Sequence, residues 1–414
     1  MASSNNNPTG INQYKDCPSK GDEKVSNIIR EYHRRGITNR QIISDLLKVE
    51  HDIQMSQASV ARRLKDLELY AAGITTRRLP ESTKRQLVLD QLGKDPVSSR
   101  GPKAVKEAIT RNTGIHLTRS FIREEMHLQD PDGFIKRLPS AKKIRRGVLT
   151  SLGPNHEWSA DGHDKLTAIG FPIYGIRDKW SGKWLGLWVV PNNRIKEVIA
   201  YLYLSLVAEL KGMPIQSTTD CGSETTMFSG LAEALREAFA SELNDVGIGP
   251  AHQFLRSVKN ITIERGWLRL RMDWVDNVKV EWAAGSDIYN SGDPKQYELV
   301  QWLWPRLIQQ ELDTFRDHAN NHTVRLDRHK ALPSGTSPNI AYSLCHKWGG
   351  ENCLKPVDVA VVKRLMDEVG GDGLIQFVTP EYAEKAQAIY DALDIQNITF
   401  ENVWGVFSRM LLKM

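Results

Sequence analysis

Cysteine is scarce in this chain, and no two of the cysteines stand in a spacing typical of metal ligands. Cys17, Cys221, Cys345 and Cys353 are the only four among 414 residues, and none belongs to a Cys-x-x-Cys pair. A content this low is untypical of disulfide-rich secreted domains and indicates a reducing compartment. The same spacing leads us to expect no structural zinc.

Long apolar runs are missing as well. No stretch of 18 apolar residues and no signal-peptide core occurs, so we expect neither a membrane-spanning helix nor secretion. The hydrophobic share of 40% and the charged share of 25% are ordinary for a globular protein of roughly two to four domains. Residues 1–22 are rich in Asn, Ser and Lys without an apolar pattern, which predicts a disordered tail.

Tryptophan is absent from the amino-terminal part of the chain. All 11 tryptophans lie between Trp158 and Trp404, which predicts a domain boundary near residue 150. Charge divides at the same place, because residues 1–150 carry 28 Lys and Arg against 17 Asp and Glu, whereas residues 151–414 carry 27 against 33. A basic amino-terminal part indicates nucleic-acid binding, although a generically basic surface would give the same balance.

Short amphipathic helices fill this basic part. Apolar spacing predicts three helices within residues 23–75 and three more within residues 80–135. Each set is typical of a helix-turn-helix domain, whose last helix presents outward residues to DNA. The outward cations predicted to bind DNA are Arg62 and Arg63 in the first domain and Arg119 and Arg123 in the second. A three-helix packing module is the alternative for the second domain.

A basic linker follows over residues 136–151. Its predicted DNA-binding residues are Lys142, Lys143, Arg145 and Arg146, which could follow a phosphate backbone. The same run could equally be a nuclear import signal or a solvated hinge. We expect a nuclear protein.

The pattern changes to alternating strands and helices over residues 152–290. Apolar runs predict a three-strand meander within 156–190, a helix over 195–211, a strand over 214–219 and a helix over 227–243. A short strand near 253–255 and a helix from about residue 260 complete the region. This is an α/β fold in the order of a ribonuclease-H-like catalytic core. Residues 291–345 are expected to form a helical extension, and residues 346–414 a C-terminal helical region for packing or oligomerisation.

Three carboxylates stand out in this core. Asp161 lies within a predicted strand, Asp220 directly after one, and Glu264 on the following helix. Hard divalent cations prefer oxygen ligands, and two such ions can hold both the attacking and the leaving oxygen of an in-line displacement. We therefore predict a catalytic site with two Mg²⁺ or Mn²⁺ ions. Without metal, mutual repulsion should raise the pKa of at least one of the three carboxylates.

Polar residues near the carboxylates are candidates for DNA contact. The predicted set is Lys165, Asn260, Arg265 and Arg271, of which the last three lie on the helix that carries Glu264. Glu224, one helical turn after Asp220, is an alternative third carboxylate. We interpret it instead as a residue that begins a helix, where the helix dipole favours an acid.

The motifs around the carboxylates occur together and in order. They are Asp161-Gly-His-Asp-Lys-Leu166, Asp220-Cys-Gly-Ser-Glu224 and Asn260-Ile-Thr-Ile-Glu-Arg-Gly-Trp267, with a tail of Asn320–Arg325 and Leu332–Gly335. From residue 136 to about 342, the chain resembles the integrase core of DDE transposases and retroviral integrases, in particular eukaryotic transposon-derived proteins. The resemblance implies 3′-end processing and strand transfer catalysed by Asp161, Asp220 and Glu264. It also implies transposon ends and target DNA as partners, and a homo-oligomer because two ends are joined.

Two other functions fit the same residues. A domesticated DNA-binding protein that is catalytically silent would keep the fold, but loss of a carboxylate would have favoured it and none is missing. A metal-dependent nuclease without strand transfer would share every active-site residue. The sequence does not separate it from a recombinase.

Overall fold

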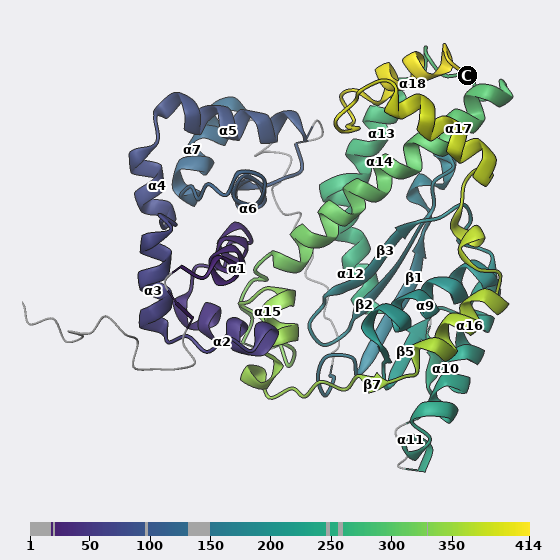
Figure 1. Ribbon diagram of the computed structural model, residues 1–414, viewed down its shortest axis with the longest axis horizontal. Coiled ribbons are helices and arrows are strands. Elements are labelled where there is room, and N and C mark those ends of the chain that lie inside the picture. The colour runs from purple at the N-terminus through teal and green to yellow at the C-terminus, as the bar shows by residue number, and fades with distance from the viewer. Residues whose placement is uncertain are drawn as a thin grey trace, which may run out of the picture. The chain divides into compact units, whose positions relative to one another are not determined.

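The structure, a computed structural model, describes residues 18–19, 21–95, 98–130, 150–245, 249–255, 260–328 and 330–414 (Figure 1). It divides into two compact units, Met1–Lys143 and Ile144–Met414. Most of the predicted tail, and all four DNA-binding candidates of the basic linker, lie outside the described residues. None of the helices in the described ranges combines the length and apolarity that a membrane crossing requires.

The amino-terminal unit is helical. Its helices are α1 (Glu23–Arg34), α2 (Arg40–His51), α3 (Gln57–Asp66), α4 (Ala72–Arg78), α5 (Glu81–Gly93), α6 (Pro102–Thr113) and α7 (Arg119–Gln129). Side chains of Asn39, Ser56 and Thr118 accept backbone N–H groups at the starts of α2, α3 and α7, so these caps fix where the helices begin. All six expected helices are present. The additional helix α4 was not predicted, because it has no side-chain cap and no buried residue that would mark it in the sequence.

A five-stranded mixed sheet organises the second unit. Its strands are β1 (Glu157–His163), β2 (Ile173–Asp178), β3 (Trp184–Val189), β5 (Gln216–Thr219) and β6 (His252–Phe254), in the order β3-β2-β1-β5-β6. The first three strands pair antiparallel, whereas β5 runs parallel to both β1 and β6. The α/β class is confirmed, and this order is consistent with a ribonuclease-H-like core.

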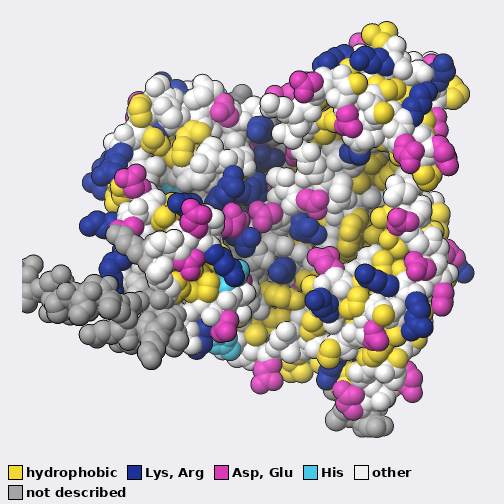
Figure 2. Space-filling model, in the orientation of Figure 1, with side chains coloured by type: hydrophobic (Ala, Val, Ile, Leu, Met, Phe, Trp, Pro, Cys, Tyr) yellow, Lys and Arg dark blue, Asp and Glu magenta, His cyan; other side chains and the backbone are white. Residues whose placement is uncertain are grey.

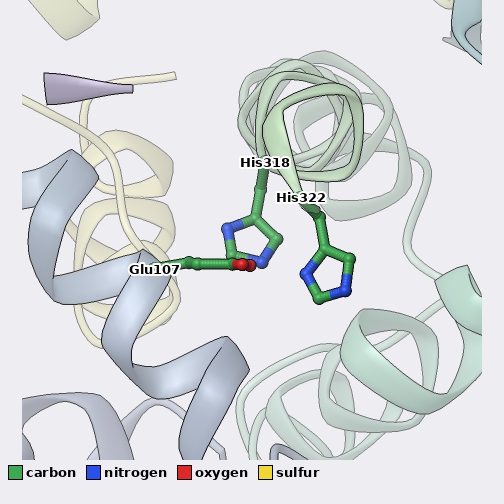
Figure 3. Close-up of side chains that lie close together, drawn as sticks. All are labelled: Glu107, His318 and His322. Carbon is green, nitrogen blue, oxygen red and sulfur yellow. The ribbon is translucent and has the colours of Figure 1, made fainter. Parts of the chain in front are cut away.

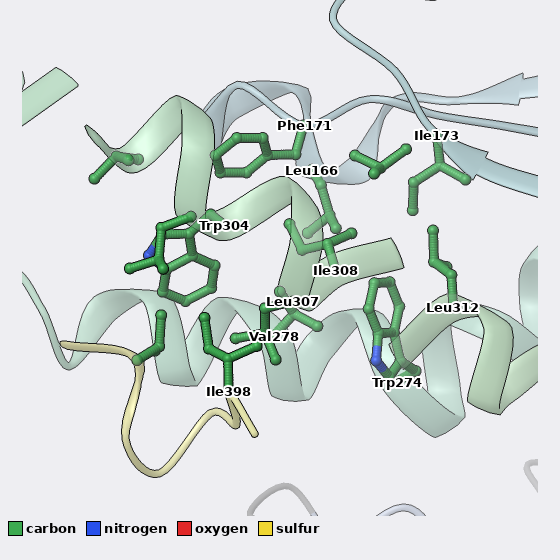
Figure 4. Close-up of a cluster of buried hydrophobic side chains, with 14 of the residues drawn as sticks. Leu166, Phe171, Ile173, Trp274, Val278, Trp304, Leu307, Ile308, Leu312 and Ile398 are labelled. Atoms are coloured by element: carbon green, nitrogen blue, oxygen red, sulfur yellow. The ribbon is translucent and has the colours of Figure 1, made fainter. Parts of the chain in front are cut away.

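Helices cover both faces of the sheet because its strands alternate apolar side chains between the two faces. Tyr174 and Ile176 pack with helices α9 (Lys196–Leu210) and α10 (Thr226–Phe239). Ile173, from the opposite face of β2, packs in a second cluster, which Figure 4 shows. Helices of that cluster are α12 (Ile261–Leu270), a π-helical turn η4 (Arg271–Val275), α13 (Asp276–Ala283) and α14 (Pro294–Asn321).

The C-terminal helices complete these two cores. Helix α16 (Val359–Glu368) packs on α9, whereas α17 (Pro380–Asp391) and α18 (Val403–Leu411) pack on α14. The ring of Trp404 lies 5.1 Å from that of Trp304 and 5.6 Å from that of Trp282. Short elements connect the larger ones: η1 (Asp164–Ile169), β4 (Gly212–Met213), η2 (Ser223–Thr225), α11 (Glu242–Asp245), α15 (Pro338–Ser343), η5 (Cys345–Trp348), β7 (Lys355–Pro356) and η6 (Asp372–Ile375). Residues 346–414 thus belong to the same compact unit as the sheet.

Candidate active site

Asp161 lies in β1, where two hydrogen bonds orient its carboxylate. Oδ1 accepts the N–H of Gly162 at 2.8 Å, and Oδ2 accepts the indole N–H of Trp267 at 2.9 Å. Burial raises the pKa of Asp161 to about 7; the indole hydrogen bond opposes this rise, and the charges of Asp220 and Glu264 add to it. The carboxylate is therefore held in one orientation.

Asp220 and Glu264 lie near this carboxylate. Asp220 follows β5, and because β5 is parallel to β1 their carboxyl ends meet at one edge of the sheet. Burial and the neighbouring charge of Glu224 raise the pKa of Asp220, whereas Arg194 lowers it. Partial burial and the charge of Asp220 raise the pKa of Glu264, which lies in the first turn of α12. Asp161 and Asp220 therefore lie beside the same cavity, and Glu264 is near enough for the charge of Asp220 to raise its pKa. Among the described residues, the three do not form a group whose carboxylate oxygens all lie within 4.8 Å of one another. Burial is the main cause of the raised pKa values, and repulsion between the carboxylates adds to it for Asp161 and Glu264.

These residues fit a divalent metal site. Three carboxylates whose pKa values are all raised gain from a cation that replaces their repulsion with attraction. The buried hydroxyl of Tyr174 lines the adjacent cavity and has no hydrogen-bond partner among the described residues. Carboxylate oxygens are the ligands that Mg²⁺ and Mn²⁺ prefer, and an unsatisfied hydroxyl can form a hydrogen bond with a water molecule of a hydrated ion. Asp161 and Asp220, which line this cavity, would hold the ion, with Glu264 nearby as the third carboxylate.

A cavity of about 210 Å³ opens beside Asp161 and Asp220. Its lining consists of Asp161, Gly162, Asp164, Tyr174, Asn193, Arg194, Asp220, Glu224 and Thr225. Glu264, on α12, is not part of this lining. Four acidic side chains and one arginine make the cavity strongly polar, so it suits an ionic ligand rather than an apolar one.

Trp267 is fixed by aromatic neighbours. Its ring lies 4.9 Å from the ring of His163 and 4.9 Å from that of Trp184. Gly175 is paired with Asp161 across β1 and β2, and a Cβ atom there would come within 2.6 Å of Trp184 and 2.7 Å of Trp267. Glycine is therefore needed opposite Asp161 to leave room for the indole. The motif Asn260–Trp267 contained Trp267, but no sequence signal marked Gly175.

Two of the residues predicted to bind DNA are buried instead. Asn260 is 3% exposed, and its Nδ2 donates to the carbonyl of Ala160 at 3.3 Å, so it fixes the backbone beside Asp161. Arg63 is 6% exposed and donates to Ser26 Oγ at 3.2 Å and to the carbonyl of Ser19 at 2.6 Å. Arg63 lies between Val60 and Leu64 on the inward face of α3, so its predicted outward orientation is wrong. The predicted DNA contact of Asn260 is corrected as well, because its side chain is buried.

The other predicted DNA-binding residues that the structure describes are exposed or half-buried. Arg265 is half-buried, and the exposed ones are Arg62, Arg119, Arg123, Lys165 and Arg271. In Figure 2, Lys and Arg side chains on the amino-terminal helices are interspersed with Asp and Glu. The contacts of these residues with DNA stay predictions.

Arg194 was not singled out in the sequence. It lies between β3 and α9, where it forms ion pairs with Asp164 and, at 3.0 Å, with Glu224. Glu224 does lie just before α10, in η2, but its carboxylate also faces the cavity. A lone arginine in a loop belongs to no motif, so only the fold could reveal this contact.

Two histidines lie close together elsewhere in this unit. His318 and His322 are one turn apart at the end of α14, with ring centroids separated by 6.2 Å (Figure 3). Glu107, drawn with them, belongs to the amino-terminal unit. These side chains are therefore not assigned a metal ion.

Comparison with known proteins agrees with this geometry. Residues 148–335 match the family model of the integrase core domain, a span that includes the three carboxylates. Domains of this family are polynucleotidyl transferases that bind DNA and depend on divalent metal ions. No curated protein matches the chain significantly. Residues 148–335 thus match an integrase core domain, and this match supports the integrase and DDE transposase superfamily for that part of the chain.

Proposed function

We propose that this protein is a DNA recombinase that processes the 3′ ends of transposon DNA and transfers them to target DNA. The observation that carries the proposal is that Asp161 and Asp220 line one cavity, with Glu264 near enough for the charge of Asp220 to raise its pKa. An acidic site of this kind, on a ribonuclease-H-like core, is suited to phosphoryl transfer between DNA strands. Asp161, Asp220 and Glu264 are the proposed catalytic residues.

The protein's own residues contribute orientation and charge. Two divalent ions, when bound, would hold the attacking and leaving oxygens in line. Trp267 and Gly162 keep the Asp161 carboxylate in one orientation, which limits the reorganisation that metal binding requires. Burial lowers the pKa of His163 to about 4, so its imidazole is neutral at neutral pH and adds no positive charge beside the metal ligands.

DNA binding is assigned to both units. The amino-terminal helices would act as helix-turn-helix domains that bind transposon ends through Arg62, Arg119 and Arg123. Lys165 and Arg271 would contact phosphates near the carboxylates, and Lys142, Lys143, Arg145 and Arg146 of the basic linker would bind the DNA backbone. Assembly into a dimer or larger homo-oligomer and action in the nucleus complete the proposal.

Purified protein incubated with supercoiled plasmid, a labelled oligonucleotide and Mn²⁺ or Mg²⁺ tests this function. Asp220→Asn should abolish joining, whereas the exposed Asp287→Asn is the matched control and should retain it. Nicking without joining would identify a nuclease instead. DNA binding with neither activity, on true element ends, would identify a silent DNA-binding protein.

A further inference from the structure

Arg194 bridges the two segments that carry the first two catalytic carboxylates. Its guanidinium pairs with Asp164, three residues after Asp161, and with Glu224, four residues after Asp220. All five of these side chains line the same cavity, and Arg194 is the basic one among the lining residues. The arginine therefore lies where a phosphate would approach the metal ligands.

The backbone of the loop that carries Arg194 is held in place, whereas the Arg194 side chain is exposed to solvent. The neighbouring Asn193 is 5% exposed and donates from Nδ2 to Asp164 at 2.8 Å. A Cβ atom on Gly162 would come within 2.9 Å of the same Nδ2, so this loop packs closely on β1. The Arg194 side chain itself is 61% exposed. Its backbone position is thus set, and its guanidinium can exchange partners without unfolding the loop.

The present partners of Arg194 are replaceable. A guanidinium binds phosphate with the same forked donor geometry that it uses for carboxylates. The Asp164 side chain is 46% exposed, and exposed ion pairs contribute little to stability. Glu224 is only 13% exposed, but divalent ions on Asp161 and Asp220 would supply positive charge close to it. Positive charge at this position would therefore favour release of Arg194.

We propose that Arg194 is a phosphate-binding residue of the active site, held by Asp164 and Glu224 in the DNA-free protein and transferred to a phosphodiester of the entering strand. This inference rests on the proposed function. It assigns the cavity a ligand class, a DNA phosphodiester, and a role to three residues outside the catalytic triad.

The salt dependence of DNA affinity tests the phosphate contact. A fluorescein-labelled duplex with a single-stranded 3′ end is titrated with the full chain in Ca²⁺, and Kd is measured by anisotropy at several KCl concentrations. Loss of one phosphate contact lowers the slope of log Kd against log [KCl] by about 0.7 to 0.9. We expect this decrease for Arg194→Gln, while Arg194→Lys keeps most of the slope. Arg364→Gln, an exposed arginine on α16, should leave it unchanged.

A gain of affinity tests the role of the two acids. In EDTA, the double variant Asp164→Asn with Glu224→Gln should bind the duplex more tightly than wild type, because Arg194 is released. Adding Arg194→Gln should remove that gain. If the gain persists in the triple variant, lower negative charge alone explains it and the inference is wrong.

Failure of this inference is distinguishable from failure of the proposed function. The inference would be wrong and the proposed function would stand if wild type joins DNA ends while Arg194→Gln has the same salt slope and melting temperature as wild type. Wild type that binds no duplex would overturn both. Thermal unfolding of each variant separates loss of fold from loss of contact.

Discussion

The indole of Trp267 is the side chain on which the orientation of Asp161 depends most directly. Trp267→Phe removes the N–H donor, and we expect Mn²⁺ affinity to fall about 10-fold to 100-fold, as for other outer partners of metal ligands. Trp274→Phe is the matched control, because Trp274 is buried on the same helical stripe and its indole N–H has no hydrogen-bond partner among the described residues. Calorimetric Mn²⁺ titrations should show a loss for Trp267→Phe alone. Equal losses in the two variants would assign Trp267 to packing only.

The proton on Asp161 predicts a pH dependence of stability. Its pKa is raised from 3.8 to about 7 in the folded protein. The folded state holds this proton more tightly than the unfolded state does. The contribution of Asp161 to the stability of the fold is therefore full below about pH 4 and is lost as the pH rises through about 7. In EDTA, the melting temperature of wild type relative to Asp161→Asn should therefore fall over this interval. Metal binds the ionised form, so Mn²⁺ affinity should rise over the same range.

The comparison with Asp161→Asn is needed because other buried groups titrate nearby. Burial lowers the pKa of His116, His163 and His252 to about 4. A lowered histidine pKa destabilises the folded state at acid pH, so these groups act in the opposite direction. The difference between the two proteins removes their contribution. A difference that does not vary with pH would contradict the raised pKa of Asp161.

At the residue scale, the sequence located the groups that chemistry requires and missed those that only packing brings near. Asp161, Asp220 and Glu264 were identifiable because metal chemistry needs carboxylates and their motifs occur in order. Arg194 reaches Glu224 across 30 residues and belongs to no motif. Burial was the other difficulty, because Asn260 was predicted to contact DNA although it lies at the buried N-cap of α12.

The pairing of β1 with β2 leaves no room for a side chain at Gly175. A methyl group there would push against Trp184 and Trp267, so Gly175→Ala should cost about 1 to 3 kcal/mol, as overpacking does. It should also displace the indole from Asp161 and lower nicking. Gly230→Ala is the opposite case, because Gly230 is exposed within α10 with no neighbour near its would-be Cβ, and should stabilise by about 0.5 to 1 kcal/mol. Urea unfolding of both variants provides the measurement, and a stable Gly175→Ala protein would show that the two tryptophans can move.

Elements were predictable where one pattern dominated. The apolar runs of β2 and β3 predicted strands, as found. Ile263, Trp267 and Trp274 form a buried stripe along α12 and the turn that follows it. The π-helical turn η4 within that stripe was not foreseen. The turn places both Trp274 and Val275 in the cluster with α14, a pairing that the spacing on one helix does not encode.

At the scale of the whole chain, the boundary between the two units predicts independent folding of the second one. Residues 144–414 form one compact unit that contains both hydrophobic clusters and the carboxylates. We expect a fragment of these residues to melt cooperatively and to nick plasmid with Mn²⁺. It should have weaker DNA affinity and a smaller salt slope than the full chain, because the basic helices are removed. Equal affinity would exclude the amino-terminal helices from DNA binding.

The same fragment without its last two helices should not fold. Trp404, Phe407 and Met410 of α18 are buried against residues of α13 and α14, and each contributes about 1.5 to 3 kcal/mol on burial. Their summed loss rivals the entire stability of a typical domain, about 5 to 15 kcal/mol. A fragment that ends before Pro380 should therefore lose its cooperative melting transition, whereas Leu412→Ala, at an 89% exposed position, should melt like its parent. If the shortened fragment still melts cooperatively and nicks DNA, α17 and α18 are dispensable for the core and serve another purpose, such as contact with a second copy of the chain.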